Sequence, residues 1–114
     1  MLSVEKLKEF GANADEGLSR CMNNESFYFR LINMAINDGG FEALGKALDD
    51  GDLDAAFEEA HKLKGVAGNL SLTPIYDPVC RLTELLRNKT PGDYKALCIE
   101  ISKQREKLLK IADE

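Results

Sequence analysis

Apolar residues recur at spacings of three and four along most of the chain, which is the period of an amphipathic helix. No segment shows the alternation of apolar and polar residues that marks a strand over a useful length. Turn and capping residues divide the helical pattern into short pieces. These dividing residues are Gly11, Asp38–Gly40, Asp49–Asp52, Thr73–Pro74 and Thr90–Pro91. The sequence therefore predicts an all-α protein.

The first third of the chain is expected to hold three helices. Ser3 can cap a short first helix that stops at Gly11, and a second helix begins near Asp15. A third helix begins at Glu25 and is ended by the glycines that follow Asp38. The apolar residues that recur at helical spacing in this third helix are Phe27, Leu31, Met34 and Ala35.

Four further helices are expected in the rest of the chain. They span Phe41 to about Leu48, Leu53 to about Leu70, Thr73 onward, and Thr90 to about Ala112. Asp52 is a good N-cap. Thr73 is expected to cap the next helix with Pro74 in its first turn, and Thr90 and Pro91 repeat this start signal. Because the connections are short, consecutive helices should pack antiparallel. We expect an up-and-down four-helix bundle with short additional helical segments at the N-terminus; another small all-helical arrangement is the alternative.

Length and charge restrict what this bundle can do. The 114 residues suit one domain that spans residues 1–114. A net charge of −5 argues against nucleic acid as a partner, because phosphate backbones attract clustered lysine and arginine. No apolar run approaches the roughly 20 residues of a membrane helix, and no signal-peptide core follows Met1. We expect a cytoplasmic monomer.

The three cysteines, Cys21, Cys80 and Cys98, lie among apolar residues and lack CxxC spacing. This favours reduced core thiols over a redox or metal-binding role.

His61 is the only histidine, and it lies in the middle of the helix expected from Leu53. One apolar stripe of that helix should face the bundle core. It consists of Leu53, Ala56, Phe57, Ala60, Leu63, Ala67 and Leu70. At 100° per residue, His61 lies roughly 120° from the centre of this stripe. The imidazole is therefore expected to point outward, where it is accessible to another molecule.

Two glycines share the outward face with His61. Gly65 and Gly68 follow it by four and seven residues, and such positions stack along one helix face. Each costs about 1 kcal/mol relative to alanine, so their presence beside the histidine calls for a reason. We interpret them as clearance that lets another protein's backbone approach the imidazole. Lys64, three residues after His61, could neutralise phosphoryl oxygens.

Other chemistries fit these residues less well. Glu58 and His61 have the Glu-x-x-His spacing of di-iron bundles, but such a site needs a second motif and inward-facing glutamates. No cysteine lies within helical reach of His61, and no Gly-rich phosphate loop, Walker lysine or kinase motif is present. The sequence therefore predicts neither a bound metal or cofactor nor an ATP-dependent enzyme.

The run from Ala60 to Leu70 resembles the signature of histidine-phosphotransfer (HPt) domains. That signature reads Ala-His-x-Leu-Lys-Gly-x-Ala-x-Asn-Leu-Gly, and the segment Leu82–Leu86 suits the next helix of the family. Ser71 departs from the pattern, because the family often has glycine there. That departure concerns the geometry of the helix connection rather than the chemistry.

The resemblance implies a phosphoryl carrier that does not bind ATP. His61 would accept a phosphoryl group from a response-regulator receiver domain or a hybrid sensor histidine kinase, and would pass it to a receiver aspartate. Lys64 would balance its charge, Gly65 and Gly68 would give access, and Mg²⁺ would be bound by the receiver. The alternative is an interaction module that binds a kinase or receiver domain without carrying phosphate.

Overall fold

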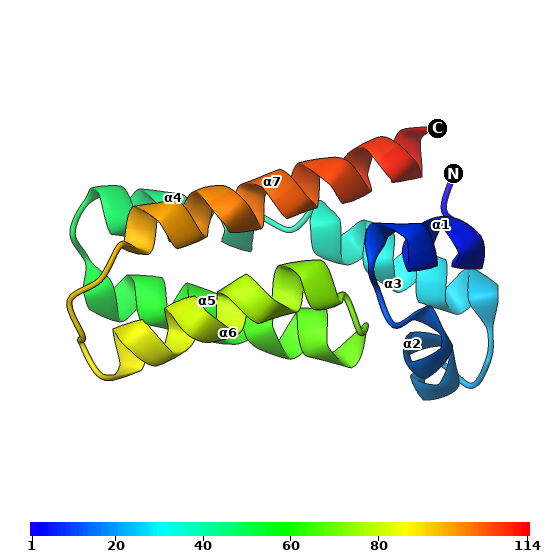
Figure 1. The fold of residues 1–114 in the computed structure, drawn as a ribbon, viewed down its shortest axis with the longest axis horizontal. Coiled ribbons are helices and arrows are strands. Elements are labelled where there is room, and N and C mark those ends of the chain that lie inside the picture. The colour runs from blue at the N-terminus through cyan, green and yellow to red at the C-terminus, as the bar shows by residue number, and fades with distance from the viewer.

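A computed structural model describes residues 1–114 and contains seven helices and no strand (Figure 1). The all-α prediction is therefore confirmed. In chain order the helices are α1 (Val4–Phe10), α2 (Ala14–Arg20), α3 (Glu25–Ile36), α4 (Gly40–Asp49), α5 (Leu53–Asn69), α6 (Thr73–Arg87) and α7 (Tyr94–Asp113). No helix combines the length and the apolar character that crossing a membrane requires.

Helices α4 to α7 form an up-and-down bundle, in which α5 packs against α4 and α6, and α7 packs against α6 and α4. The short helices α1 to α3 lie together at one end, beside the α5–α6 connection and the C-terminal half of α7 (Figure 1). The expected four-helix bundle with short N-terminal helical segments is thus confirmed. Its buried apolar residues form one cluster to which all seven helices contribute.

Capping side chains set most helix starts. Ser3, Asn24 and Asp52 each accept a hydrogen bond from a backbone N–H in the first turn of the helix that follows. Gly11 ends α1 with φ +108°, a left-handed conformation that favours glycine. These signals are local in the sequence, and for this reason the expected boundaries of α1, α3 and α5 agree closely with the structure.

Two expected starts are wrong in detail. Thr73 does not cap α6: Leu72 occupies the N-cap position without a side-chain hydrogen bond, and Thr73 is already helical. The last helix begins at Tyr94 rather than at Thr90, because Asp93 is its N-cap and accepts from the N–H of Ala96 at 2.9 Å. A threonine–proline pair suits a first turn, but a nearby aspartate is the stronger cap.

The residues that α3 buries are not the apolar ones whose spacing indicated this helix. Tyr28, Ile32 and Ile36 are buried, whereas Phe27 is 39% exposed and Met34 is 65% exposed. Both sets have helical spacing, so the sequence pattern alone does not distinguish them. Tertiary contacts decide, because α3 turns the tyrosine toward the end of α5.

Tyr28 is fully buried, and its hydroxyl donates a hydrogen bond to the carbonyl oxygen of Leu70 at 2.7 Å. Gly17 of α2 lies against the phenol, where a Cβ would overlap the hydroxyl, so only glycine fits there. Burial raises the pKa of Tyr28 to about 12. The tyrosine therefore joins α2, α3 and the end of α5 through one buried group.

Replacing Tyr28 with phenylalanine is expected to lower the free energy of unfolding by about 1–3 kcal/mol, because the buried Leu70 carbonyl loses its donor. Urea unfolding measures the loss, with Tyr94→Phe as the control, since the Tyr94 hydroxyl donates a hydrogen bond to an exposed carbonyl.

The stability that Tyr28 contributes should also depend on pH. The unfolded phenol ionises near pH 10, and the folded one only near pH 12. Stability that is complete below pH 10 is thus lost as the pH rises toward 12, and Tyr28→Phe should lack this component. An unfolding free energy equal to wild type would contradict the role of the hydroxyl.

Candidate functional site

His61 lies exposed on α5, on the side away from the bundle core. The inward side of the helix consists largely of alanine, and Ala56, Ala60 and Ala67 are buried together with Leu63. Of the expected core stripe, five residues are buried, and Leu53 and Phe57 are half-buried. The structure therefore places the histidine where the helical pattern predicts it.

The imidazole is in contact with one aromatic ring. Phe57, one helical turn earlier, stacks on His61 with ring centroids 5.7 Å apart and an angle of 18° between the planes. Arg87 of α6 lies over the same phenyl ring, with its Cζ 5.2 Å from the ring centroid. The apolar pattern of the helix placed Phe57 in the core stripe, although its i, i+4 spacing to His61 already allowed this contact.

An open groove of about 590 Å³ begins at His61 and extends along the outer side of α5. All four residues predicted for the site line it: His61, Lys64, Gly65 and Gly68. The opposite walls come from α2 and α6, and they include Glu16, Arg20, Tyr76 and Asp77. These wall residues are distant in sequence from His61, and no local pattern indicated them.

The two lysines beside His61 are in different situations. Lys62 is exposed and pairs with Glu59 at 3.6 Å, so its charge is partly compensated. Lys64 is half-buried, lines the groove and has no ion-pair partner. Of the two, Lys64 is the cation available to an anion bound at His61.

The two glycines also differ. A Cβ at Gly65 would meet no atom within 4 Å, so this position leaves open space beside the histidine. At Gly68 a Cβ would lie 2.9 Å from Cε1 of Tyr76, so the missing side chain makes room for that ring. The geometry supports clearance at Gly65, whereas Gly68 serves the packing of α5 on α6.

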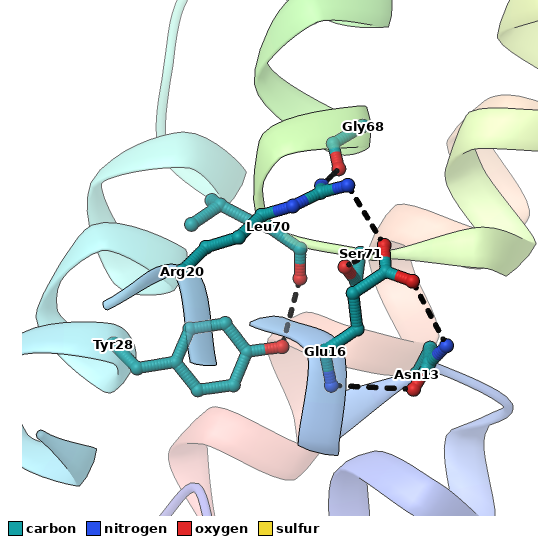
Figure 2. A network of polar contacts seen from close by, with 7 residues as sticks. All are labelled: Asn13, Glu16, Arg20, Tyr28, Gly68, Leu70 and Ser71. Carbon is teal, nitrogen blue, oxygen red and sulfur yellow. Dashed lines mark hydrogen bonds and ion pairs between the residues drawn. The ribbon is translucent and has the colours of Figure 1, made fainter. Parts of the chain in front are cut away.

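Polar contacts join α2 and α3 to the C-terminus of α5 (Figure 2). The last carbonyls of a helix lack intrahelical donors. Here Arg20 donates to the carbonyl of Gly68, Tyr28 donates to that of Leu70, and the N–H of Asn13 donates to that of Ser71 at 3.0 Å. The N-terminal helices thus cap the helix that carries His61.

Ser71, the one departure from the family signature, is part of this cap. Its φ of +56° is left-handed, the conformation that glycine adopts easily and serine does not. Its hydroxyl donates to a carboxylate oxygen of Glu16 at 3.0 Å, and Glu16 also pairs with Arg20 at 2.9 Å (Figure 2). The turn therefore keeps the glycine-like geometry, and the serine adds a bond to α2.

A second groove, of about 720 Å³, lies on the other side of Gly65, between α3 and α5. Its apolar lining includes Leu31, Met34 and Val66. Met34 and Val66 are 65% and 42% exposed, so this groove presents apolar side chains to solvent. Met34 therefore lies at the surface next to the site.

The cysteines are all free, with Cys21 buried and Cys80 and Cys98 half-buried. Burial raises the pKa of Cys98, which disfavours the thiolate. No group of three or more histidine, cysteine, aspartate or glutamate side chains is placed to hold a metal ion.

Comparison with protein-family models gives a match to the family described as Hpt domain, over residues 38–110. The match covers more than half of the chain and includes α4, α5, α6 and most of α7. Comparisons with curated proteins and with solved structures give no match. The matched region contains His61 and Lys64, whereas Arg20 and Tyr28 lie outside it.

The two glycines should respond differently to alanine. Gly65→Ala is expected to raise the free energy of unfolding by up to about 1 kcal/mol, because it adds helix propensity in open space. Gly68→Ala must displace Tyr76 and should not show this gain. Urea unfolding of the two variants measures the difference directly. Equal stabilisation by both would show that the Tyr76 ring yields freely and that Gly68 is not needed for packing.

Proposed function

Because the chain belongs to the Hpt domain family, whose members carry phosphoryl groups in two-component signalling, we propose that it carries one on His61. The single observation that carries this proposal is the placement of the only histidine. His61 is exposed at mid-helix, at the head of a groove that also holds Lys64 and the open space at Gly65.

The chemistry requires little of this chain beyond position and charge. A ring nitrogen of His61 attacks the phosphorus of an aspartyl phosphate on a receiver domain. A phosphorus–nitrogen bond forms, the bond from phosphorus to the aspartate oxygen breaks, and the carboxylate leaves with the electron pair. The reverse reaction passes the group to another receiver. Mg²⁺ and the acidic pocket would belong to the receiver.

Lys64 supports this role through its charge. A phosphoryl group adds close to two negative charges at neutral pH, on a chain whose net charge is already −5. Lys64 lines the groove without an ion-pair partner, whereas Lys62 is engaged by Glu59. An accessible ammonium is worth on the order of 1 kcal/mol to a phosphoryl group, and salt screens it.

The surface around His61 suits a protein partner of the receiver or hybrid-kinase type. Gly65 lines both grooves, so the backbone of a partner can approach the imidazole between them. The exposed Met34 and Val66 then offer apolar contact next to the polar groove. A module that binds such a partner without accepting phosphate remains the alternative function, and labelling of His61 distinguishes the two.

Incubation with a phosphorylated receiver domain and Mg²⁺ should place an acid-labile, alkali-stable label on the wild-type chain. His61→Gln should abolish the label and change the free energy of unfolding by no more than about 1 kcal/mol, because the residue is exposed. Autoradiography and urea unfolding give the two measurements. Binding of the receiver with no label on the wild-type chain would favour the interaction module, and a label retained by His61→Gln would refute the site.

Lys64→Ala should slow transfer moderately, by about tenfold at low salt, and Lys64→Arg should lose less because it keeps the charge. The deficit should shrink at high ionic strength. Lys62→Ala is the matched control, because Lys62 already pairs with Glu59. Transfer rates from one receiver at low and high salt test all four proteins. Full activity of Lys64→Ala at low salt, or an equal loss in Lys62→Ala, would contradict the proposed charge effect.

A further inference from the structure

The side chain in contact with the proposed reacting ring is Phe57, whose phenyl group stacks on the imidazole of His61. Building on the proposed function, we infer that Phe57 is a positioning residue: it covers one face of the imidazole and leaves the nitrogen-bearing edge open for phosphoryl transfer.

The geometry of the stack is compatible with the reaction. The two rings are nearly parallel, at 18°, and their centroids are 5.7 Å apart, which is an offset arrangement. The lone pair that attacks phosphorus lies in the plane of the imidazole and points away from the ring edge. A neighbour on the face therefore restricts the rotation of the side chain without obstructing the incoming group.

Phe57 is itself held in place from two sides. It is half-buried and packs against the hydrophobic core cluster. The guanidinium of Arg87 lies over its ring, and that arginine is paired with Glu84 at 3.3 Å on α6. The phenyl ring is consequently a fixed surface, whereas an exposed imidazole without such a neighbour would sample several rotamers.

A restricted imidazole should react faster because more of its conformations present a nitrogen to the phosphoryl donor. This effect belongs to the ring and does not depend on a docked protein, so a small donor can test it. Phosphoramidate is suitable: the ring nitrogen forms a bond to phosphorus, the original phosphorus–nitrogen bond breaks, and ammonia leaves with its electron pair.

With potassium phosphoramidate as donor, Phe57→Leu should lower the rate of His61 labelling by about threefold to tenfold, the range that corresponds to loss of one aromatic contact. Phe57→Tyr keeps a ring and should restore most of the rate. Labelling is followed by mass spectrometry at alkaline pH. A Phe57→Leu rate equal to wild type would overturn the inference, and so would a Phe57→Tyr rate as low as that of Phe57→Leu.

The chain offers a matched control in Phe41 of α4. Its ring also lies under an arginine, with Cζ of Arg105 4.5 Å from the centroid, but the only aromatic stack on His61 is that of Phe57. Phe41→Leu removes a comparable ring from the bundle and should leave the labelling rate unchanged. An equal slowing in both leucine variants would show a general effect on the fold and refute positioning by Phe57.

A spectroscopic measurement tests the stack independently of transfer. Because His61 is the only histidine, its imidazole proton signals are unambiguous. In wild type they should be shifted upfield by the ring current of Phe57; this shift should disappear in Phe57→Leu and persist in Phe41→Leu. Unchanged signals in Phe57→Leu would contradict the stack. If wild type took no phosphoryl group from either phosphoramidate or a receiver, the proposed function would fail, and the ring-current shift would still decide whether the stack exists.

Discussion

The alanine-rich inner face of α5 determines where His61 lies. Ala56, Ala60 and Ala67 are almost completely inaccessible, and such small side chains let the axis of α5 come close to its neighbours α4 and α6. Close packing on these sides fixes the rotation of α5 about its own axis, since any turn would press larger side chains into the core or expose the alanines. The outward direction of His61 is therefore a consequence of how the opposite side of α5 packs in the core, rather than of any contact made by the histidine itself.

The position of α5 along its axis depends on contacts at its C-terminus. Arg20, Tyr28 and Asn13 donate to the carbonyls of Gly68, Leu70 and Ser71 at this end of the helix. The carbonyl of Gly68 also accepts from the backbone N–H of Ser71 at 3.2 Å. The guanidinium at this end also interacts favourably with the negative end of the helix dipole. Arg20, Tyr28 and Asn13 all lie before residue 38, where the family match begins. The N-terminal helices are thus joined to the helix of the proposed site, and Arg20 and Glu16 form one end of the groove that begins at His61.

Those parts of the fold that rest on local signals could be predicted from the sequence, and those that rest on distant partners could not. Asp52 and the stripe along α5 predicted both the start of that helix and the outward face of His61. The face of α3 was ambiguous, because the sets containing Met34 and Tyr28 are equally periodic, and only the buried Leu70 carbonyl selects the tyrosine. The same reason explains Gly68, whose neighbour Tyr76 belongs to another helix. The stack of Phe57 on His61 is a local i, i+4 contact, but the apolar character of Phe57 pointed to the core instead.

The small number of charged groups around His61 agrees with the requirements of a phosphoryl carrier. A site that held a phosphohistidine with several buried cations would stabilise the phosphorylated state so strongly that transfer onward would become slow. Here one lysine without an ion-pair partner lines an open groove, and its interaction with the proposed phosphoryl group would be weak and screened by solvent. The proposed positioning by Phe57 acts through the face of the imidazole and would add no direct contact to a phosphoryl group on a ring nitrogen. Such positioning would orient the ring for both directions of the proposed transfer without a contact that favours the phosphorylated state, as reversible exchange with a receiver aspartate would require.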